Sequence, residues 1–407
     1  MKKPLVIFAL FTSAYFLSYF YRLANAVISP DLTAELSLTA AQLGLTTSVF
    51  FATFAAVQIP LGIGLDRWGP RWVTPGLMFV GVIGSLVFSV ATSFTVLTIG
   101  RGLIGIGMAG ILMGSLKAFS QWFPPERFAT MAGLLVGIGS TGAFFAATPL
   151  AWFNEQVGWR SVFVGMGIVT LAVALIIITF ARNTPPGVAW PKPQKGRGGV
   201  GQVLKDGRFW RIAPVSMFAS GTTLAFQGLW AGPYLFDIHG LSQIDGGNIL
   251  LWIAVGATLG FVSSGWIADR FGLPRVVLIG TSSFVVAQIV LALRPPLALV
   301  GFMFFLFGFG GGYSILVLAH IRRLFPDEIT GQAITAVNLF GFAGTFLLQW
   351  LMGVIIGSFM ADASGAYPPI AYTTVLLVTA VCNTIALIRY YPLIGGPATT
   401  PVLESSG

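Results

Sequence analysis

The 407-residue sequence has few of the side chains that bind metals or carry redox chemistry. It contains a single cysteine, Cys382, and its two histidines are His239 and His320. One cysteine cannot form an internal disulfide, and these residues make no set with metal-ligand spacing. The sequence also lacks the G-x-x-x-x-G-K-[ST] loop that binds the phosphates of ATP. We therefore expect no metal, no cofactor and no direct use of ATP, and we find no catalytic residues that would indicate an enzyme.

Charged residues are scarce as well. They make up 9% of the chain, whereas 56% of the residues are hydrophobic and the mean hydropathy is +0.86. A soluble domain has about a quarter of its residues charged, so this composition indicates a chain that folds in lipid, where about 20 apolar residues cross the hydrocarbon as a helix. The sequence predicts an all-α integral membrane protein with twelve transmembrane helices, at residues 5–29, 40–65, 73–93, 95–120, 128–150, 160–181, 210–236, 247–267, 275–293, 297–320, 330–357 and 370–391. No small-residue cleavage site follows the first stretch, so we do not expect a cleaved signal peptide.

The net charge of +9 would suit a nucleic-acid-binding protein, but its distribution indicates a different cause. Most lysines and arginines fall in the loops on one side of the predicted helices, and few fall on the other side. This is the positive-inside bias of an integral membrane protein. We expect a protein of the bacterial cytoplasmic (inner) membrane with both termini in the cytoplasm, and the lipid bilayer, not nucleic acid, as its surroundings.

The sequence repeats itself in two halves of six predicted helices each. A charged loop after the second helix and a Phe-Pro phrase after the fourth helix both recur in the second half with nearly the same separation. The repeats pair Gly62, Asp66, Arg67 and Gly69 with Gly265, Asp269, Arg270 and Gly272, and FPPE at 123–126 with FPDE at 325–328. The halves are separated by a hydrophilic stretch rich in Pro, Gly and basic residues, which is typical of a flexible linker. The predicted parts are a bundle at 1–181, a cytoplasmic linker at 182–209, a second bundle at 210–391 and a tail at 392–407, whose final LESSG resembles a cloning remnant.

The first loop, G-x-x-x-D-R-x-G-x-R at 62–71, resembles the signature loop of the major facilitator superfamily. Arg101-x-x-Ile104-Gly105-x-Gly107 is similar to that family's fourth-helix motif, and GWRSVF at 158–163 resembles the start of its sixth helix. The resemblance covers essentially the whole chain. It implies two pseudo-symmetric six-helix bundles that move a substrate by alternating access, and a structural or coupling role for Arg101 and Gly105.

The repeated loop is expected to be a gate on the cytoplasmic side. A glycine at a helix end lets a neighbouring helix approach closely, and Asp66 can cap the next helix or pair with an arginine across the seam between the halves. The alternative is that Asp66 and Arg67 are interfacial charges that only fix the topology. The second loop departs from the pattern, because Leu273 and Pro274 move Arg275 one place along. The predicted gating residues are Gly62, Asp66, Arg67, Gly69, Arg71, Gly265, Asp269 and Arg270.

Two glycine-rich stretches match the dinucleotide-binding pattern G-x-G-x-x-G, namely GIGMAG at 105–110 and GIGSTG at 137–142. That pattern requires a preceding strand and an acidic residue about 20 positions later. Both stretches lie inside apolar helices and neither has such an acid. We therefore interpret them as sites of close helix packing.

The ionisable residues inside the predicted helices are basic. No acidic residue falls in the middle of a predicted helix, so we do not expect a proton relay through a mid-membrane carboxylate. Arg22, Arg101 and Lys117 do lie within predicted helices. A charge there costs at least about 2.5 kcal/mol, so each is a candidate functional residue. For both arginines the alternative is a structural role, and Lys117 could instead extend to the interface.

Arg22 belongs to a polar stripe on the first predicted helix, and the seventh helix carries a matching stripe. The helical spacing puts each set on one face; the sets are Thr12, Tyr15, Tyr19, Arg22 and Asn25, and Thr223, Gln227, Trp230 and Tyr234. The family resemblance implies that the first, fourth, seventh and tenth helices line the substrate path. Lys117 and His320 occupy pseudo-symmetric positions and could face each other across its inner mouth. The predicted substrate-binding residues are Arg22, Tyr15, Tyr19, Asn25, Lys117, Gln227, Trp230, Tyr234, Tyr313, His320 and Asn338; for Tyr313 and Asn338 the alternative is helix–helix hydrogen bonding.

These features predict a secondary active transporter of a small anionic or zwitterionic organic solute, because the predicted cavity has basic groups and no acid. A coupling ion, proton or sodium, and a monomeric state are part of this expectation. One alternative is an exporter of hydrophobic drugs or metabolites, which the 35 Phe and 11 Trp would also suit. Another is a transport-inactive sensor or structural membrane protein.

Overall fold

The computed structural model describes residues 2–188, 190, 200–363 and 365–394, most of which are helical. The rest of the predicted linker and most of the predicted tail (395–407) lie outside the described residues. The helices of the first half are α1 (Lys2–Leu23), α2 (Asn25–Leu36), α3 (Ala40–Trp68), α4 (Pro70–Ser89), α5 (Phe94–Ala109), α6 (Ile111–Trp122), α7 (Pro125–Gly139), α8 (Gly142–Phe145) and α9 (Thr148–Phe180). Those that follow are α10 (Val200–Lys205), α11 (Phe209–Val215), η1 (Ser216–Ser220), α12 (Gly221–Ala225), η2 (Phe226–Trp230), α13 (Ala231–His239), α14 (Gln243–Phe271), α15 (Leu273–Ala292), α16 (Leu297–Gly312), η3 (Tyr313–Ile315), α17 (Leu316–Leu324), α18 (Asp327–Gly357), α19 (Pro369–Tyr390) and η4 (Tyr391–Leu393).

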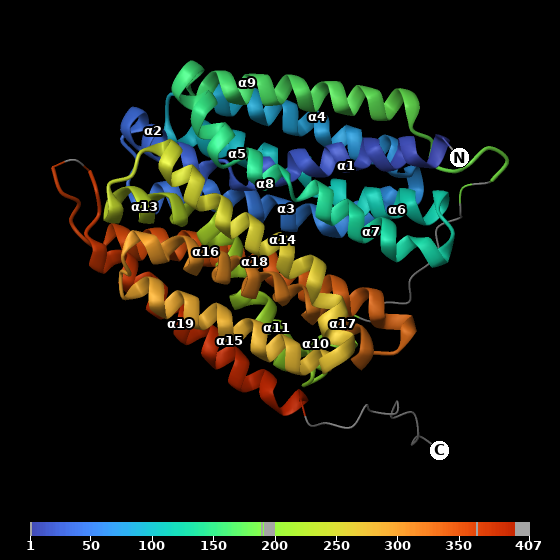
Figure 1. Cartoon of the computed structure of the whole chain (residues 1–407). Helices are drawn as coiled ribbons and strands as arrows, with labels where there is room; N and C mark the ends of the chain where they lie inside the picture. The colour runs from blue at the N-terminus through green and yellow to red at the C-terminus, as the bar shows by residue number, and fades with distance from the viewer. Residues whose placement is uncertain (1, 189, 191–199, 364, 395–407) are drawn as a thin grey trace.

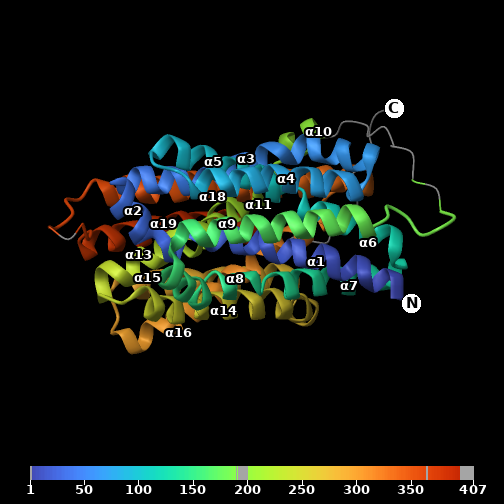
Figure 2. The ribbon, with the colours of Figure 1, turned by 90° about the horizontal axis from the view of Figure 1, so that it is seen from above.

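The two halves of the sequence form two groups of roughly aligned helices, one beside the other (Figure 1; the view from above is Figure 2). Helices α2 and α13 lie at one end of the molecule, which we call the distal end. Helices α6, α7, α10 and α17 lie toward the opposite end, where the chain crosses between the halves, which we call the linker end.

Eleven helices in the described part of the chain are long and apolar enough to cross a membrane. The structure departs from the prediction of twelve helices at the seventh stretch, 210–236. There the chain runs from α11 to α13 through short helical pieces. Two of these pieces, η1 and η2, are π-helical turns. A π-turn widens the helix by one residue per turn and is frequent at functional sites. The seventh predicted span is therefore a series of short helical pieces and not one long helix.

Four other helical runs are also interrupted within the membrane-sized stretch. The first breaks at Ala24, the fourth at Gly110 and the fifth at Ser140 and Thr141, and the tenth contains the short turn η3. The first, fourth and tenth runs are, with the seventh, those that the family resemblance assigns to the substrate path. Irregular backbone at membrane depth is tolerated where it is buried in protein or lines a cavity, so the breaks indicate where a cavity lies.

The repeated loop forms the same backbone turn in both halves. Gly69 joins α3 to α4 with φ +77°, and Gly272 joins α14 to α15 with φ +86°. Residues with a side chain rarely adopt this left-handed region, whereas glycine does so without strain. The backbone conformation of this turn therefore explains why both halves have glycine at this position.

The halves are packed together at the distal end. A Cβ added to Gly44 of α3 would lie 2.9 Å from the Gln349 carbonyl oxygen of α18, and one added to Gly353 would lie 2.5 Å from the Ala40 carbonyl oxygen. Polar contacts join the halves there too: Gln243 Nε2 donates to Asp31 Oδ2 at 2.9 Å, and the Ala40 amide donates to Tyr367 Oη at 3.2 Å.

The same seam helices diverge at the linker end. A Cβ added to Gly62 of α3, Gly133 of α7, Gly265 of α14 or Gly331 of α18 would meet no atom within 4 Å. The prediction that Gly62 and Gly265 allow close helix contact is therefore wrong for this conformation. The halves are thus in close contact at the distal end, whereas these four glycines near the linker end contact no neighbouring helix.

Candidate substrate site

A cavity of about 170 Å³ lies between the two halves, and we call it the central cavity. Its lining comes from the interrupted helical runs and from α14 and α18. The lining residues are Tyr15, Tyr19, Arg22, Leu112, Ser140, Ala143, Ser216, Ser220, Thr223, Leu224, Gln227, Ala254, Ala257, Thr258, Phe261, Gly311, Ser314, Ile315, Val317, Leu318, Asn338, Gly341 and Phe342. Arg22 is the one charged residue among them.

Arg22 lies one residue before the end of α1, with 5% of its surface exposed. Its guanidinium is surrounded by aromatic rings, with the carbon Cζ 4.9 Å from the ring centre of Phe54 and 5.2 Å from that of Tyr19. Tyr15 and Phe342 lie at 6.0 and 5.8 Å. Cation–π contacts of this kind contribute about 0.5–2 kcal/mol each, which lowers the free-energy penalty of burying the charge without neutralising it.

No acidic side chain neutralises Arg22 in the described part of the chain. The ion pairs found there within 4.0 Å join Lys117 to Asp66, Arg160 to Glu35 and Arg208 to Asp206. The buried Nε of Arg22 also has no hydrogen-bond acceptor. A buried cation without a counter-charge is strongly unfavourable, so Arg22 is a charged group of the central cavity whose burial the described protein atoms do not neutralise.

The C-terminal half contributes uncharged polar groups to the same cavity. Ser220 Oγ donates to Ser314 Oγ at 2.9 Å, so these two hydroxyls are already partnered. The side-chain amides of Gln227 and Asn338 have no hydrogen-bond partner among the described residues. Each amide can donate and accept. Both amides therefore remain available for further hydrogen bonds in the central cavity.

Four of the predicted substrate-binding residues are buried between helices and do not line the central cavity. Each makes a hydrogen bond to a protein atom: Asn25 Nδ2 donates to Thr47 Oγ1 (2.9 Å), Trp230 Nε1 to the Gln349 carbonyl (2.9 Å), Tyr234 Oη to the Leu291 carbonyl (3.0 Å), and Tyr313 Oη is paired with Ser263 Oγ (3.3 Å). Asn25 Oδ1 is buried without a partner. The predicted stripes fail at these positions because the break at Ala24 and the π-turns change the helical phase. Residues beyond each interruption turn toward neighbouring helices.

The predicted pair of Lys117 and His320 is also wrong for this structure, because each is engaged within its own half. Lys117 Nζ forms an ion pair with Asp66 Oδ1 at 2.7 Å, and His320 Nδ1 is paired with Tyr390 Oη at 2.7 Å. Lys117 and Asp66 are partly exposed, whereas His320 is buried. Of the predicted substrate residues, the structure thus brings together Arg22, Tyr15, Tyr19, Gln227 and Asn338.

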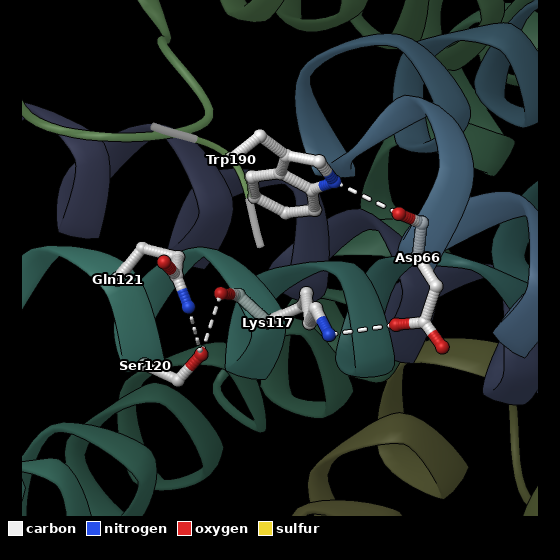
Figure 3. Close-up of polar contacts among 5 residues, drawn as sticks. All are labelled: Asp66, Lys117, Ser120, Gln121 and Trp190. Atoms are coloured by element: carbon white, nitrogen blue, oxygen red, sulfur yellow. Dashed lines mark hydrogen bonds and ion pairs between the residues drawn. The ribbon is translucent and has the colours of Figure 1, made fainter. Parts of the chain in front are cut away.

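Asp66 of the gating loop takes its partner from an unexpected element. It pairs with Lys117 of α6 in the same half, where an arginine across the seam was predicted (Figure 3). Trp190 of the linker donates from Nε1 to the Asp66 carbonyl oxygen at 2.8 Å, and its ring lies 5.8 Å from Lys117 Nζ. Trp190 therefore packs on the gating loop of the first half.

The rest of the first loop is held by Asn183. Its Oδ1 accepts from the Arg71 amide at 2.9 Å, and its Nδ2 donates to the Trp68 carbonyl at 3.1 Å. A Cβ at Gly69 would lie 2.3 Å from Asn183 Nδ2, so Gly69 is required both for its backbone angle and for this contact. Arg67 packs on the Trp68 ring at 5.4 Å.

The second loop keeps the turn but not the ion pair. Asp269 is exposed and forms no ion pair within the described residues. Arg270 lies over the rings of Trp266 and Phe271 at 5.9 and 5.8 Å. The two loops therefore resemble each other in sequence and backbone turn but differ in their side-chain contacts.

Arg101 and Gly105 lie in the packed interior of the first half. Arg101 is fully buried and donates from Nη1 to the Tyr21 carbonyl at 2.7 Å and from Nη2 to the Arg22 carbonyl at 3.4 Å. A Cβ at Gly105 would lie 2.3 Å from the Phe50 carbonyl oxygen. Arg101 thus supports the backbone that carries Arg22, and Gly105 permits close packing of α5 on α3.

The structure adds residues that the sequence analysis did not select. Phe54 and Phe342 complete the aromatic surround of Arg22, and Ser220 contributes a hydroxyl. Buried aromatic and hydroxyl residues are common in apolar helices, so no sequence signal distinguished these three. Within the described residues, no group of three or more His, Cys, Asp or Glu is placed to hold a metal ion.

Membrane-spanning helices in two packed halves, with a largely apolar cavity at their seam that contains Arg22 and a few polar side chains, are the arrangement of an integral membrane transporter of small molecules. Residues 11–349 match the family model described as the Major Facilitator Superfamily. The chain belongs to this superfamily, which confirms the predicted family, the all-α membrane fold and the non-enzymatic assignment.

Two relatives align over almost their whole length. The D-galactonate transporter of Escherichia coli O6:H1 is 25% identical over 91% of this chain and 92% of its own. The hexuronate transporter of Bacillus subtilis is 24% identical over 98% of this chain and 97% of its own. A nitrate/nitrite transporter of Picosynechococcus is 26% identical, but over 56% of this chain and 50% of that protein.

The fold is also similar to solved transporter structures. A bacterial homolog of the human lysosomal transporter Spinster, in an inward-facing and unoccupied conformation, superposes with a TM-score of 0.77 at 20% identity, over 96% of this chain and 97% of that one. A D-xylose-proton symporter gives a TM-score of 0.75 at 14% identity, over 96% and 98%. At these identities the likeness concerns the fold alone.

Proposed function

We propose that this protein is a secondary active transporter that moves a small anionic or zwitterionic organic solute by alternating access. The observation that carries the proposal is Arg22, buried in the central cavity without a carboxylate partner. A ligand carboxylate placed there accepts two parallel hydrogen bonds from the guanidinium and removes the free-energy penalty of the unpaired charge.

The second half of the cavity suits a solute with hydroxyl groups. Gln227 and Asn338 of the C-terminal half offer free amides to the central cavity. A cavity of about 170 Å³ accommodates a small metabolite better than a bulky hydrophobic drug, which disfavours the exporter alternative. The names of the relatives, transporters of D-galactonate and hexuronate, support a hydroxylated acid.

Alternating access would expose Arg22 first at one end of the seam and then at the other. In the structure the halves are in close contact at the distal end and glycines near the linker end contact no neighbouring helix, so we assign this conformation to the inward-facing state. This assignment places the linker end and both termini in the cytoplasm, the protein in the bacterial inner membrane, and one chain as the functional unit. A proton or sodium ion is the proposed source of coupling energy.

A ligand screen by thermal shift tests the proposal on the purified protein. D-Galactonate, D-glucuronate and nitrate represent anions, D-xylose a neutral sugar and choline a cation. We expect one or more of the organic anions to raise the unfolding temperature in a saturable way. Stabilisation by choline or by hydrophobic amines, with no response to any anion, would contradict the proposal and favour the exporter; no response to any solute would favour the sensor alternative.

A further inference from the structure

A second cavity, of about 500 Å³, lies at the distal end between the two halves, and we call it the distal cavity. From the first half it is lined by residues of α2 and by Ala40 and Leu43 of α3. From the second half it is lined by Trp230, residues of α13 and the loop that precedes α19. Its wall contains one carboxylate, that of Asp237, which directly follows the seventh predicted span.

Asp237 is held by neutral donors and not by a cation. Its Oδ2 accepts from Tyr372 Oη at 2.5 Å and from the Tyr367 amide at 3.0 Å. No lysine, arginine or histidine lies within 4.0 Å of the carboxylate in the described part of the chain. A partly buried carboxylate without a counter-charge is relieved by binding a proton. Burial raises the pKa of Asp237, and the nearby Asp362 raises it further, against the lowering effect of the two donors.

Asp237 is connected to the contact that closes the distal end. Tyr367, whose amide donates to Asp237, accepts from the Ala40 amide of the first half through its own hydroxyl. Separation of the halves at this end would break that contact and widen the distal cavity. The carboxylate would then be more fully hydrated, and its pKa would fall toward the usual range of an aspartate.

We propose that Asp237 is the binding site of the proton that couples transport, and that this proton stabilises the state in which the distal end is closed. The proposal rests on the alternating-access function proposed above. The closed state has the higher pKa, so it binds the proton more tightly, and lowering the pH shifts the population toward it. As the pH rises through that pKa, the closed state loses this stabilisation.

The other titratable and charged groups around the distal cavity are engaged elsewhere or differ in sign. On α2, Asp31 accepts from Asn154 and Gln243, and Glu35 pairs with Arg160 at 3.0 Å. Arg294 donates to Thr373 Oγ1, next to Tyr372, at 3.2 Å. His239 follows on α13, and burial lowers its pKa. The groups that contact or influence Asp237 are therefore Tyr367, Tyr372 and Asp362. Among the other groups named here, His239 is the one whose ordinary pKa falls in the pH range tested below.

The test measures the distal separation of the halves without any substrate. Cys382 is replaced by Ser, and spin labels are placed at the exposed positions Gln156 and Ala298 by Gln156→Cys and Ala298→Cys. Distances between the labels are recorded by double electron–electron resonance in lipid nanodiscs between pH 5 and pH 8.5. For each unit by which the pKa of Asp237 in the closed state exceeds that in the open state, the closed-to-open ratio changes tenfold.

We expect the short-distance population of the parent protein to grow as the pH falls. Asp237→Asn, which mimics the protonated carboxyl, should give mainly the short distance at every pH. Tyr372→Phe removes a donor to the charged form, so it should move the transition to higher pH. The matched controls Asp31→Asn and His239→Gln should keep the pH response.

A pH response that survives in Asp237→Asn, or one that disappears in His239→Gln instead, would overturn the proposal. A parent protein whose distances do not change with pH would overturn it as well. No anion is present in this experiment, so its failure leaves the anion site at Arg22 standing. Conversely, if no anion stabilises the protein in the thermal-shift screen, the distances between the spin labels still test the role of Asp237.

Discussion

Substitution of Arg22 gives the most direct test of the central cavity. The side chain is 5% exposed, contacts four aromatic rings and has no carboxylate partner in the described chain. Removing one member of a buried, hydrogen-bonded charge pair costs about 2–5 kcal/mol of binding free energy. Arg22→Ala should therefore weaken anion binding by about 30-fold to several thousand-fold, since each 1.4 kcal/mol is about tenfold.

Arg22→Lys separates geometry from charge. Lysine keeps the positive charge but cannot form two parallel hydrogen bonds with a carboxylate, so we expect an affinity loss of about tenfold, or about 1.4 kcal/mol. The stability of the free protein should be less affected. Arg22→Ala deletes a buried charge whose penalty is at least about 2.5 kcal/mol together with four cation–π contacts that total about 2–8 kcal/mol. Because the two terms oppose each other, its unfolding temperature without ligand should change much less than its affinity.

Binding is measured by isothermal titration with the anion that the thermal-shift screen identifies, and transport by uptake into proteoliposomes. Arg275→Ala, at an exposed arginine of the second loop, is the matched control and should bind the anion normally. Wild-type affinity in Arg22→Ala would refute the reasoning and favour the hydrophobic exporter. A large loss of unfolding temperature in Arg22→Ala would indicate that the arginine has a structural role.

Three further predictions concern the gating loop and the polar side of the cavity. Asp66→Asn or Lys117→Ala breaks the 2.7 Å ion pair and should slow proteoliposome exchange while equilibrium affinity stays within a few-fold; a collapse of affinity with an unchanged rate would show that the loop binds substrate. Gly69→Ala should destabilise the protein by about 1–3 kcal/mol and lower its unfolding temperature, because Gly69 has a φ of +77° and contacts Asn183. Gly62→Ala, in open space, should leave the unfolding temperature unchanged. Equal effects of the two substitutions would contradict the backbone argument. Gln227→Ala should weaken binding of a hydroxylated acid about tenfold, by loss of about one hydrogen bond, and leave nitrate binding unchanged, as titration of both anions would show.

The sequence by itself determined the class of protein and much of the first half of its site. Long apolar stretches predict membrane helices because lipid leaves no other partner for the backbone hydrogen bonds. The repeated loop located the turns at Gly69 and Gly272, since only glycine adopts that backbone angle readily. The spacing of Tyr15, Tyr19 and Arg22 placed them on one face, and the structure shows that face at the central cavity, because α1 is regular over these residues.

Only the tertiary structure decided which polar side chains remain available to a ligand. A helical stripe holds its direction only while the helix is regular, so Asn25, beyond the break at Ala24, turns to Thr47 instead of the cavity. The partner of Asp66 is Lys117, 51 residues away, and no local pattern distinguishes that lysine from an arginine across the seam. The availability of a buried polar atom depends on which helices pack against it, and that packing joins residues far apart in the chain.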